Sequence, residues 1–450
     1  MGFDFIKKLP TPEEIRNQYP IDAEIQALKE KLIGMQDIDR AVANILRLKF
    51  RMGLFENPYV SPEKAGRTVR SRAHKELARQ VARKGVVLLK NEGILPLSKQ
   101  LKSIAVIGPN ADNMYNQLGD YTAPQERKEI TTVLDGIRNT VSASTQVTYV
   151  KGCAIRDTTA HHIPAAVEAA QKADAVVLVV GGSSARDFKT KYIETGAATV
   201  TQEENQQLSD MECGEGYDRS TLKLLGYQEK LMEAITSTGK PVIVIYIQGR
   251  PLNMNLAAEK AQALLTAWYP GEQGGAAIAD VLFGDYNPAG RLPVSIPRSE
   301  GQLPLFYSQG EQRSYVEEAG TPLYAFGYGL SYTLFDYSHL KLEKGNSPDI
   351  LQKVSCTITN IGDRDGEEVV QLYICDKVAS VLQAPILLKG FRRIFLKKGE
   401  SKQVTFTLGK EELSLYNMKM KQVVEPGEFK VMVGTASNDI RLDGEFTLTP

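Results

Sequence analysis

The segment Ala175-Val176-Val177-Leu178-Val179-Val180 is continuously apolar, and so is Val242-Ile243-Val244-Ile245-Tyr246-Ile247. Apolar, β-branched runs without polar alternation are typical of strands that are buried on both faces of a parallel sheet. Segments with helical periodicity lie between such runs, at 164–172 and 227–237. Strands that alternate with helices predict an α/β sandwich with a mostly parallel sheet. Further strands of this sheet are expected at 103–107, 146–150 and 263–267.

Beyond residue 335 the pattern changes to short strand-like segments separated by turn residues. No segment with helical periodicity interrupts them, which is typical of a small all-β sandwich. We therefore expect three parts, at residues 1–60, 61–335 and 336–450. The strands expected in the last part lie at 354–360, 367–374, 403–408 and 427–433.

The composition is that of an ordinary globular protein. A chain of 450 residues exceeds the usual size of one core, so two or three domains are expected. Lys+Arg and Asp+Glu both number 54, which argues against a nucleic-acid or acidic-membrane partner, since those favour a positive surplus. No apolar run approaches the roughly 20 residues that span a bilayer. The first residues do not resemble a secretory signal, and the compartment stays open.

The cysteines and histidines give little indication of chemistry. Cys153, Cys213, Cys356 and Cys375 show no Cys-x-x-Cys spacing and no histidine cluster, so we expect no metal site. Cys356 and Cys375 lie in apolar strands and are interpreted as small buried hydrophobes. Cys213 is expected to be accessible, because it lies close to a polar loop.

That loop, Cys213-Gly214-Glu215-Gly216-Tyr217-Asp218-Arg219, places one carboxylate between two glycines. Flanking glycines leave room for a proton donor to approach a substrate, although a solvated surface turn has the same composition. Negative charge on Asp210, Glu212 and Asp218 would favour a protonated Glu215, whereas Arg219 would oppose it. A phosphate-binding turn at Gly181-Gly182 is disfavoured, because both nucleotide-binding glycine signatures are missing.

Several motifs along the chain resemble those of glycoside hydrolase family 3, the β-glucosidases and β-xylosidases. They occur in family order from about residue 37 to the C-terminus. The resemblance implies a fibronectin type III-like domain at 336–450 and no cofactor. The motifs are Ala82-Arg83-Lys84-Gly85-Val86-Val87-Leu88-Leu89-Lys90-Asn91-Glu92, Ala105-Val106-Ile107-Gly108-Pro109-Asn110-Ala111-Asp112, Ala267-Trp268-Tyr269-Pro270-Gly271, Ala279-Asp280-Val281-Leu282-Phe283-Gly284-Asp285-Tyr286-Asn287-Pro288, Gly290-Arg291-Leu292-Pro293 and Phe326-Gly327-Tyr328-Gly329-Leu330-Ser331-Tyr332.

Members of this family carry a (β/α)8 barrel of roughly 250 residues before this region, with the catalytic nucleophile in a Ser-Asp-Trp type motif. The chain contains no such motif, and its one tryptophan, Trp268, lies in a different one. Residues 1–60 resemble only the closing helices of the barrel and a linker. The chain is therefore similar to the C-terminal portion of the enzyme, without most of the barrel.

The resemblance also implies the site. Glu215 matches the acid/base glutamate of members with a Gly-Glu-Gly-Tyr loop, and Glu212 is the alternative. The sequence departs from the family at Leu225, where proline is usual. Arg186 and Asp187 follow the end of an expected strand, where open α/β sheets bind ligands, and are candidates for contacts to a sugar, although solvated lid residues would look the same.

The implied reaction is the retaining hydrolysis of terminal β-D-glucosyl or β-D-xylosyl residues, with a β-linked oligosaccharide or glycoside as substrate. Retaining glycosidases need two carboxylates, and this chain matches only one of them. We therefore expect the chain alone to be inactive and to need a partner barrel domain. The alternative is a non-catalytic truncated or split-gene half that binds sugar or a barrel without turnover.

Overall fold

The computed structural model describes residues 22–123, 125–185, 210–214, 216–310, 313–347 and 349–449. The chain divides into two compact units, Met1–Ser71 and Arg72–Pro450. In these described ranges no helix is long and apolar enough to cross a membrane.

The described residues of the first unit are mainly helical. Its longest helix is α3, in which apolar residues recur at helical spacing and no residue is buried. Val42 and Ile45 are 49% and 60% exposed, so the apolar stripe of α3 lacks a covering partner within the described residues. The helices of this unit are α2 (Asp22–Lys29), α3 (Met35–Arg51) and α4 (Pro62–Thr68).

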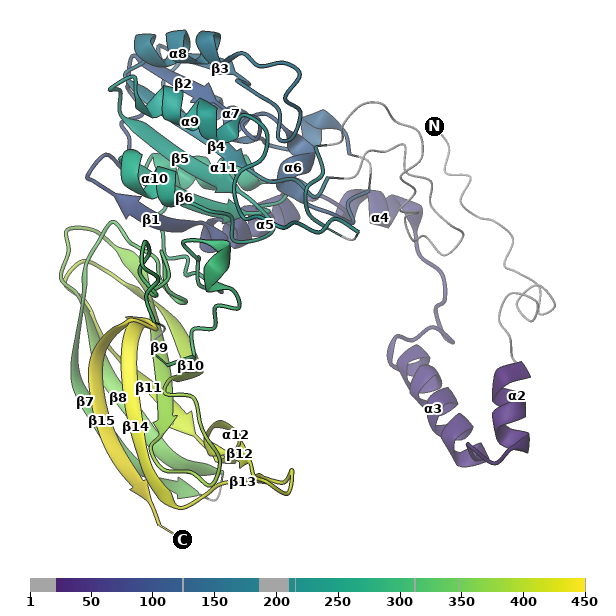
Figure 1. The fold of residues 1–450 in the computed structure, drawn as a ribbon. Coiled ribbons are helices and arrows are strands. Elements are labelled where there is room, and N and C mark those ends of the chain that lie inside the picture. The colour runs from purple at the N-terminus through teal and green to yellow at the C-terminus, as the bar shows by residue number, and fades with distance from the viewer. Residues whose placement is uncertain are drawn as a thin grey trace. The chain divides into compact units, whose positions relative to one another are not determined.

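The second unit begins with the predicted α/β sandwich (Figure 1). Its six strands are arranged in the order β1-β6-β5-β4-β2-β3, and every neighbouring pair is parallel except β1 with β6. The sequence correctly predicted a mostly parallel sheet, but β1 was not among the expected strands. The strands are β1 (Val87–Asn91), β2 (Ser103–Ile107), β3 (Gln146–Val150), β4 (Ala175–Gly181), β5 (Val242–Ile247) and β6 (Ala263–Trp268).

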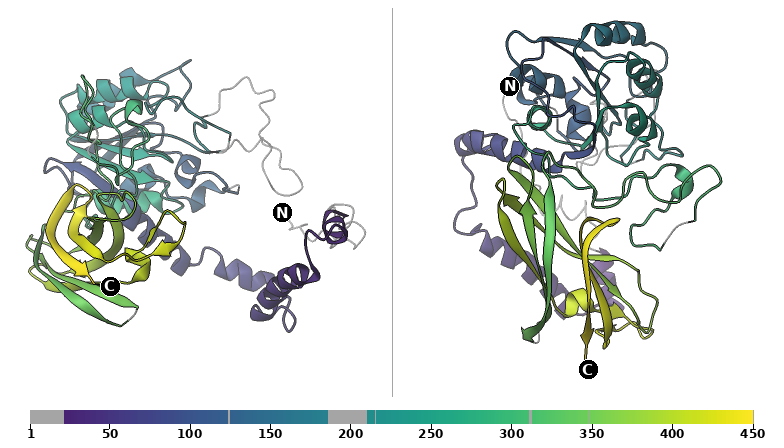
Figure 2. Two further views of the ribbon diagram at one scale, coloured as in Figure 1. Left: turned by 60° about the horizontal axis from the view of Figure 1, so that its bottom comes forward. Right: turned by 90° about the vertical axis from the view of Figure 1, so that its left-hand side faces the viewer.

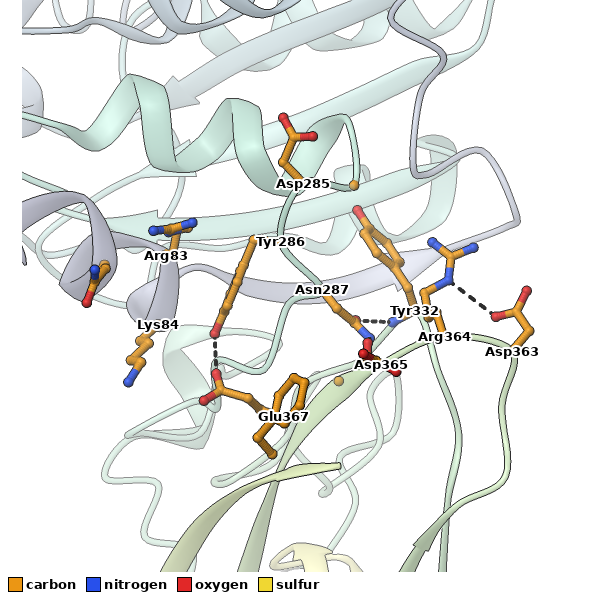
Figure 3. Close-up of a pocket in the computed structure, with 14 residues that line it drawn as sticks. Arg83, Lys84, Asp285, Tyr286, Asn287, Tyr332, Asp363, Arg364, Asp365 and Glu367 are labelled. Carbon is orange, nitrogen blue, oxygen red and sulfur yellow. Dashed lines mark hydrogen bonds and ion pairs between the residues drawn. The ribbon is translucent and has the colours of Figure 1, made fainter. Parts of the chain in front are cut away.

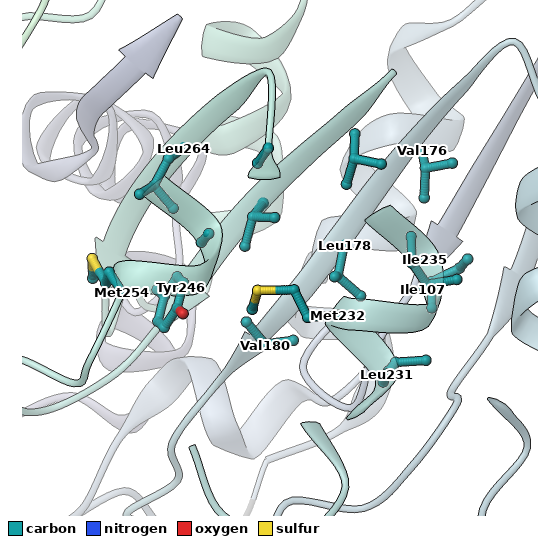
Figure 4. Close-up of a cluster of buried hydrophobic side chains, with 14 of the residues drawn as sticks. Ile107, Val176, Leu178, Val180, Leu231, Met232, Ile235, Tyr246, Met254 and Leu264 are labelled. Atoms are coloured by element: carbon teal, nitrogen blue, oxygen red, sulfur yellow. The ribbon is translucent and has the colours of Figure 1, made fainter. Parts of the chain in front are cut away.

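Helices cover both faces of this sheet, which is why its central strands are apolar throughout. Alternate side chains of β4, such as Leu178 and Val180, pack with Leu231 and Met232 of α9 (Figure 4). The intervening side chains face α7 and α11 on the other side. Each such fully buried aliphatic side chain contributes about 1.5–3 kcal/mol. The helices are α5 (Arg72–Gly85), α6 (Met114–Leu118), η1 (Arg127–Glu129), α7 (Val133–Thr140), α8 (Ile163–Lys172), α9 (Gln228–Thr236), α10 (Asn255–Lys260), α11 (Gly274–Leu282) and η2 (Glu300–Gln302).

The predicted all-β sandwich follows. Its two antiparallel sheets, β10-β9-β14-β15 and β11-β8-β7, face each other across one apolar core (Figure 2). Three long strands of the domain, at Phe335–Ser347, Leu387–Leu396 and Asp439–Leu448, were missed, because each buries only one side chain and carries several charges. The elements are β7 (Phe335–Ser347), β8 (Ile350–Asn360), β9 (Gly366–Asp376), β10 (Leu387–Leu396), β11 (Ser401–Leu408), α12 (Lys410–Leu413), β12 (Leu415–Tyr416), β13 (Gln422–Val423), β14 (Gly427–Ala436) and β15 (Asp439–Leu448).

Polar side chains join the β-sandwich to the α/β sandwich. Arg291 donates to both carboxylate oxygens of Glu368 on β9, at 3.0 and 3.1 Å, and Tyr337 donates to the same carboxylate at 3.1 Å. Gln371 reaches the carbonyl oxygen of Gly327 at 3.0 Å. Arg291 and Glu368 are only 9% and 3% exposed. The Gly-Arg-Leu-Pro motif therefore carries a buried charge that connects the two domains.

A cleft of about 730 Å³ lies along the same junction (Figure 3). Tyr286 donates a hydrogen bond of 2.6 Å to Glu367, and Arg364 pairs with Asp363 at 3.3 Å. Asn287 Nδ2 donates to the carbonyl oxygen of Asp365 at 3.0 Å. These polar groups of the cleft satisfy one another, as expected for a seam between two packed domains.

Candidate functional site

The site is built from the carboxyl ends of the parallel strands. The chain continues from β2 to β3 on one side and then crosses to β4 on the other side of β2. Where the strand order reverses in this way, the loops after the two strands diverge and leave a crevice at the edge of the sheet. The topological switch point of this sheet therefore lies at the carboxyl ends of β2 and β4.

A buried hydrogen-bond network fixes the chain at this edge. Asn110, which follows β2, donates to the carbonyl oxygen of Gly182 at 3.1 Å and accepts from Asn116 at 2.7 Å. Ser183, which follows β4, donates to Asn116 at 2.7 Å. All three polar side chains are buried, and a satisfied buried network of this kind holds its backbone rigidly.

The segment that precedes Glu215 is anchored on this network. The backbone amides of Glu212 and Cys213 both donate to the carbonyl oxygen of Ser183, at 2.8 and 3.2 Å. Arg156 donates to the carbonyl oxygen of Met211 at 2.7 Å. Asp210 accepts from the amide of Ile155 at 3.1 Å. Asp210 is thus used as a backbone acceptor.

The segment that follows Glu215 is anchored separately. Arg250, from the loop after β5, donates to the carbonyl oxygen of Tyr217 at 3.1 Å. The amide of Tyr217 donates to the carbonyl oxygen of Gly214 at 3.1 Å, which closes the turn across the position of Glu215. Gln228, at the start of α9, bonds both the amide and the carbonyl group of Gly181, at 2.9 and 3.0 Å. Both ends of the turn therefore rest on the carboxyl edge of the sheet.

An ion pair joins the two ends. Arg219 Nη1 lies 2.5 Å from Glu212 Oε2, and the two side chains are 6% and 1% exposed. Glu212 was the alternative acid/base candidate. Because its carboxylate is buried and bound to a guanidinium, it has the arrangement of a structural carboxylate. Arg219, whose charge was expected to act on Glu215, neutralises Glu212 in the described structure.

The prediction that Cys213 is accessible is wrong. Its thiol is buried and lies 3.0 Å from the hydroxyl oxygen of Tyr269, at the end of the Ala-Trp-Tyr motif. Burial raises the pKa of the Cys213 thiol, and burial together with this hydrogen bond raises the pKa of Tyr269. The side chain points inward because its backbone is fixed to Ser183, a long-range contact that the local sequence does not show.

Glu215, Arg186 and Asp187 lie outside the described residues. The glycines on either side of Glu215 are described and exposed, and both have positive φ, 113° at Gly214 and 80° at Gly216. Such angles favour glycine strongly. A Cβ on Gly214 would also lie 2.8 Å from the Met211 side chain. The two glycines are thus required by the backbone, in addition to the space they leave at the edge of the sheet.

Sequence reasoning missed the residues that hold this turn. Arg156, Ser183 and Tyr269 lie 30 or more positions away in the chain and reach the turn only through the fold. Arg219 was recognised in the sequence as a charge close to Glu215, but its ion pair with Glu212 was not foreseen. Among the described residues no group of three or more His, Cys, Asp or Glu side chains is placed to hold a metal.

The fold and the site together define a class of protein: an α/β sandwich that presents an anchored acidic turn at its carboxyl edge, followed by a β-sandwich. Comparison with known families agrees. The model of the glycosyl hydrolase family 3 C-terminal domain matches residues 86–332, and that of the fibronectin type III-like domain matches residues 368–437. The chain belongs to glycoside hydrolase family 3.

Individual relatives are similar over most of this chain. A β-xylosidase of Formosa agariphila is 41% identical over 421 residues, which cover 90% of this chain and 54% of the relative. A periplasmic β-glucosidase of Salmonella typhimurium is 36% identical over 464 residues, which cover 94% of this chain and 57% of the relative. The chain spans just over half the length of these curated relatives.

Solved structures give the same result. A β-glucosidase from Erythrobacter marinus is 35% identical with a TM-score of 0.79, and the match covers 94% of this chain and 57% of that structure. The β-glucosidase from Listeria innocua, solved in complex with glucose, is 31% identical with a TM-score of 0.78, and the match covers 94% and 56%. The family resemblance inferred from the motifs is confirmed.

Proposed function

We propose that this chain supplies the proton-transferring half of a retaining β-glycosidase, with Glu215 as general acid and base. The nucleophilic carboxylate would come from a (β/α)8 barrel domain outside these 450 residues. The substrate class is a terminal β-D-glucosyl or β-D-xylosyl residue, in keeping with relatives that are named for both activities.

One observation carries this proposal. In a chain of family 3, the turn that contains Glu215 is tied at both ends to the edge of the sheet where α/β proteins bind ligands. Ser183 holds the segment before it, and Arg250 holds the segment after it. A proton donor needs such fixed support together with free space, which the exposed Gly214 and Gly216 leave around it.

The chemistry follows from the roles of two carboxyl groups. In the first step the nucleophile attacks the anomeric carbon while Glu215 gives its proton to the departing oxygen, so that the glycosidic bond breaks and a glycosyl-enzyme forms. In the second step the Glu215 carboxylate removes a proton from a water molecule whose oxygen bonds to the anomeric carbon, while the bond from that carbon to the nucleophile breaks, so the sugar leaves with retained configuration and Glu215 is protonated again. Arg186 and Asp187 are proposed to contact a sugar hydroxyl near this site.

The first test compares the chain alone with the chain mixed with, or joined to, the barrel domain of a relative. Aryl β-glucosides and aryl β-xylosides are the substrates. We expect no hydrolysis above background by the chain alone, because an acid without its nucleophile cannot form the glycosyl-enzyme. Steady turnover by the pure chain would rule out a nucleophile on a separate domain. No turnover in any combination would favour the non-catalytic half.

The second test is Glu215→Ala in the active combination. Substrates with poor leaving groups should slow severely, whereas the first step with activated aryl glycosides should be nearly unchanged, since a good leaving group needs little protonation. Azide should restore turnover and yield the β-glycosyl azide, because azide attacks without a general base. An equal loss on both substrate types without azide rescue would show that Glu215 is a structural residue of the turn.

A further inference from the structure

Glu212 and Arg219, which form a buried ion pair, flank Glu215 in the chain. These residues stand three positions before and four positions after it in the chain. Their charged atoms approach to 2.5 Å in an almost fully buried site. The contact closes the base of the turn with a charged hydrogen bond, which is shorter and more directional than a neutral one.

Each partner is also fixed independently of the other. The amide of Glu212 is bound to Ser183, and its carboxylate occupies space beside Gly182, where a Cβ would lie 2.0 Å from Glu212 Oε1. Arg219 Nη2 donates to the carbonyl oxygen of Lys223, on the path to α9. The pair therefore links the end of β4 to the segment that leads into the next helix.

This pair is poorly suited to a purely stabilising role. Glu212 Oε1 and Arg219 Nε are both buried and have no hydrogen-bond partner among the described residues. Buried charges whose remaining polar atoms are unsatisfied repay little of their desolvation, and apolar residues would often stabilise the fold as well. A role in setting the geometry of the turn explains the arrangement better.

We propose that Glu212 and Arg219 form a positioning pair, which fixes the separation of the two ends of the turn and so the reach of the Glu215 carboxyl group. This inference rests on the proposed function of Glu215. A general acid must come within about 2.6–3.2 Å of the oxygen that it protonates, and a misplacement of about 1 Å can lower a rate roughly 100-fold. Both side chains are almost fully buried, so the pair acts through the turn.

The first experiment measures amide hydrogen exchange in the complete chain. Glu212→Gln removes the charge but keeps the size, and it should speed exchange at 213–219 at least tenfold. The matched control is Glu368→Gln, which also breaks a buried ion pair but lies at the junction with the β-sandwich. Arg219→Lys should retain more protection than Arg219→Met. Unchanged exchange at 213–219 in Glu212→Gln would overturn the proposal, as would an equal change at 213–219 in Glu368→Gln.

The second experiment measures turnover in the combination with a barrel domain. Glu212→Gln should slow kcat for alkyl or disaccharide substrates about 10–100-fold, with a much smaller loss for dinitrophenyl glycosides. Glu368→Gln should affect both substrates equally. If Glu215→Ala shows leaving-group dependence and Glu212→Gln does not, the positioning role is wrong. If Glu215→Ala itself shows none, the proposed function fails and the positioning role fails with it.

Discussion

The strongest test of the domain junction is Glu368→Ala. Glu368 accepts two hydrogen bonds from Arg291, at 3.0 and 3.1 Å, and a third from Tyr337 at 3.1 Å. Removing the carboxylate leaves the Arg291 guanidinium, only 9% exposed, without its counter-charge. The loss of one partner from a buried ion pair costs about 3–5 kcal/mol. The unpartnered Tyr337 hydroxyl is part of the same network, so its loss does not add in full.

This free energy translates into a measurable melting temperature. The unfolding entropy of a unit as long as Arg72–Pro450 is roughly 0.8 kcal/mol per kelvin, so a loss of about 4 kcal/mol lowers Tm by about 5 °C if the unit unfolds cooperatively. Calorimetry of the wild type and the variant measures both the Tm and the unfolding entropy. If the β-sandwich melts separately, its transition should shift further than this.

Two control variants test whether the buried, unpaired charge causes the loss of stability. Glu428→Ala removes an exposed carboxylate of the same domain, which pairs with Lys377 at 3.1 Å, and it should change stability by less than about 1 kcal/mol. The double variant Arg291→Met with Glu368→Leu should recover most of the loss, because no charge remains buried. A Tm shift below 1 °C for Glu368→Ala would refute the reasoning. A Tm shift for Glu428→Ala as large as that for Glu368→Ala would refute it as well.

Two further predictions concern the chain itself. The exposed apolar stripe of α3 should promote self-association of the chain. Ile45→Glu should therefore lower the mass measured by light scattering, whereas the control Asn44→Glu should leave it unchanged. A wild-type chain that is already monomeric would contradict this prediction. Burial raises the pKa of the Cys153 thiol to about 12, against about 8.5 for a thiol in the unfolded chain. Unfolding therefore releases a proton above about pH 9. The free energy of unfolding should fall by about 1.4 kcal/mol per pH unit from there towards pH 12. Denaturant titrations at pH 8 and 10 should show a smaller loss for Cys153→Ala than for the wild type, and equal losses would refute the assignment.

The sequence was informative where a residue's environment follows from its neighbours in the chain. The central strands β4 and β5 were predicted because both of their faces are buried, which leaves an uninterrupted apolar run. Strands β7, β10 and β15 were missed because each buries only one side chain and carries several charges. Cys213 was misjudged because a thiol next to the exposed Gly214 can still point inward.

The sequence by itself determined the layered α/β architecture, the following β-sandwich, the family and Glu215 as the candidate acid, since periodicity and short motifs are local properties. Only the tertiary structure decided that Glu212 pairs with Arg219, that Ser183 and Arg250 hold the two ends of the turn, and that Arg291 joins the domains. These contacts join segments that are distant in the chain, or they lie in a turn whose backbone is held by distant residues. Burial then makes them specific, because a charge removed from water must find its partner within the fold.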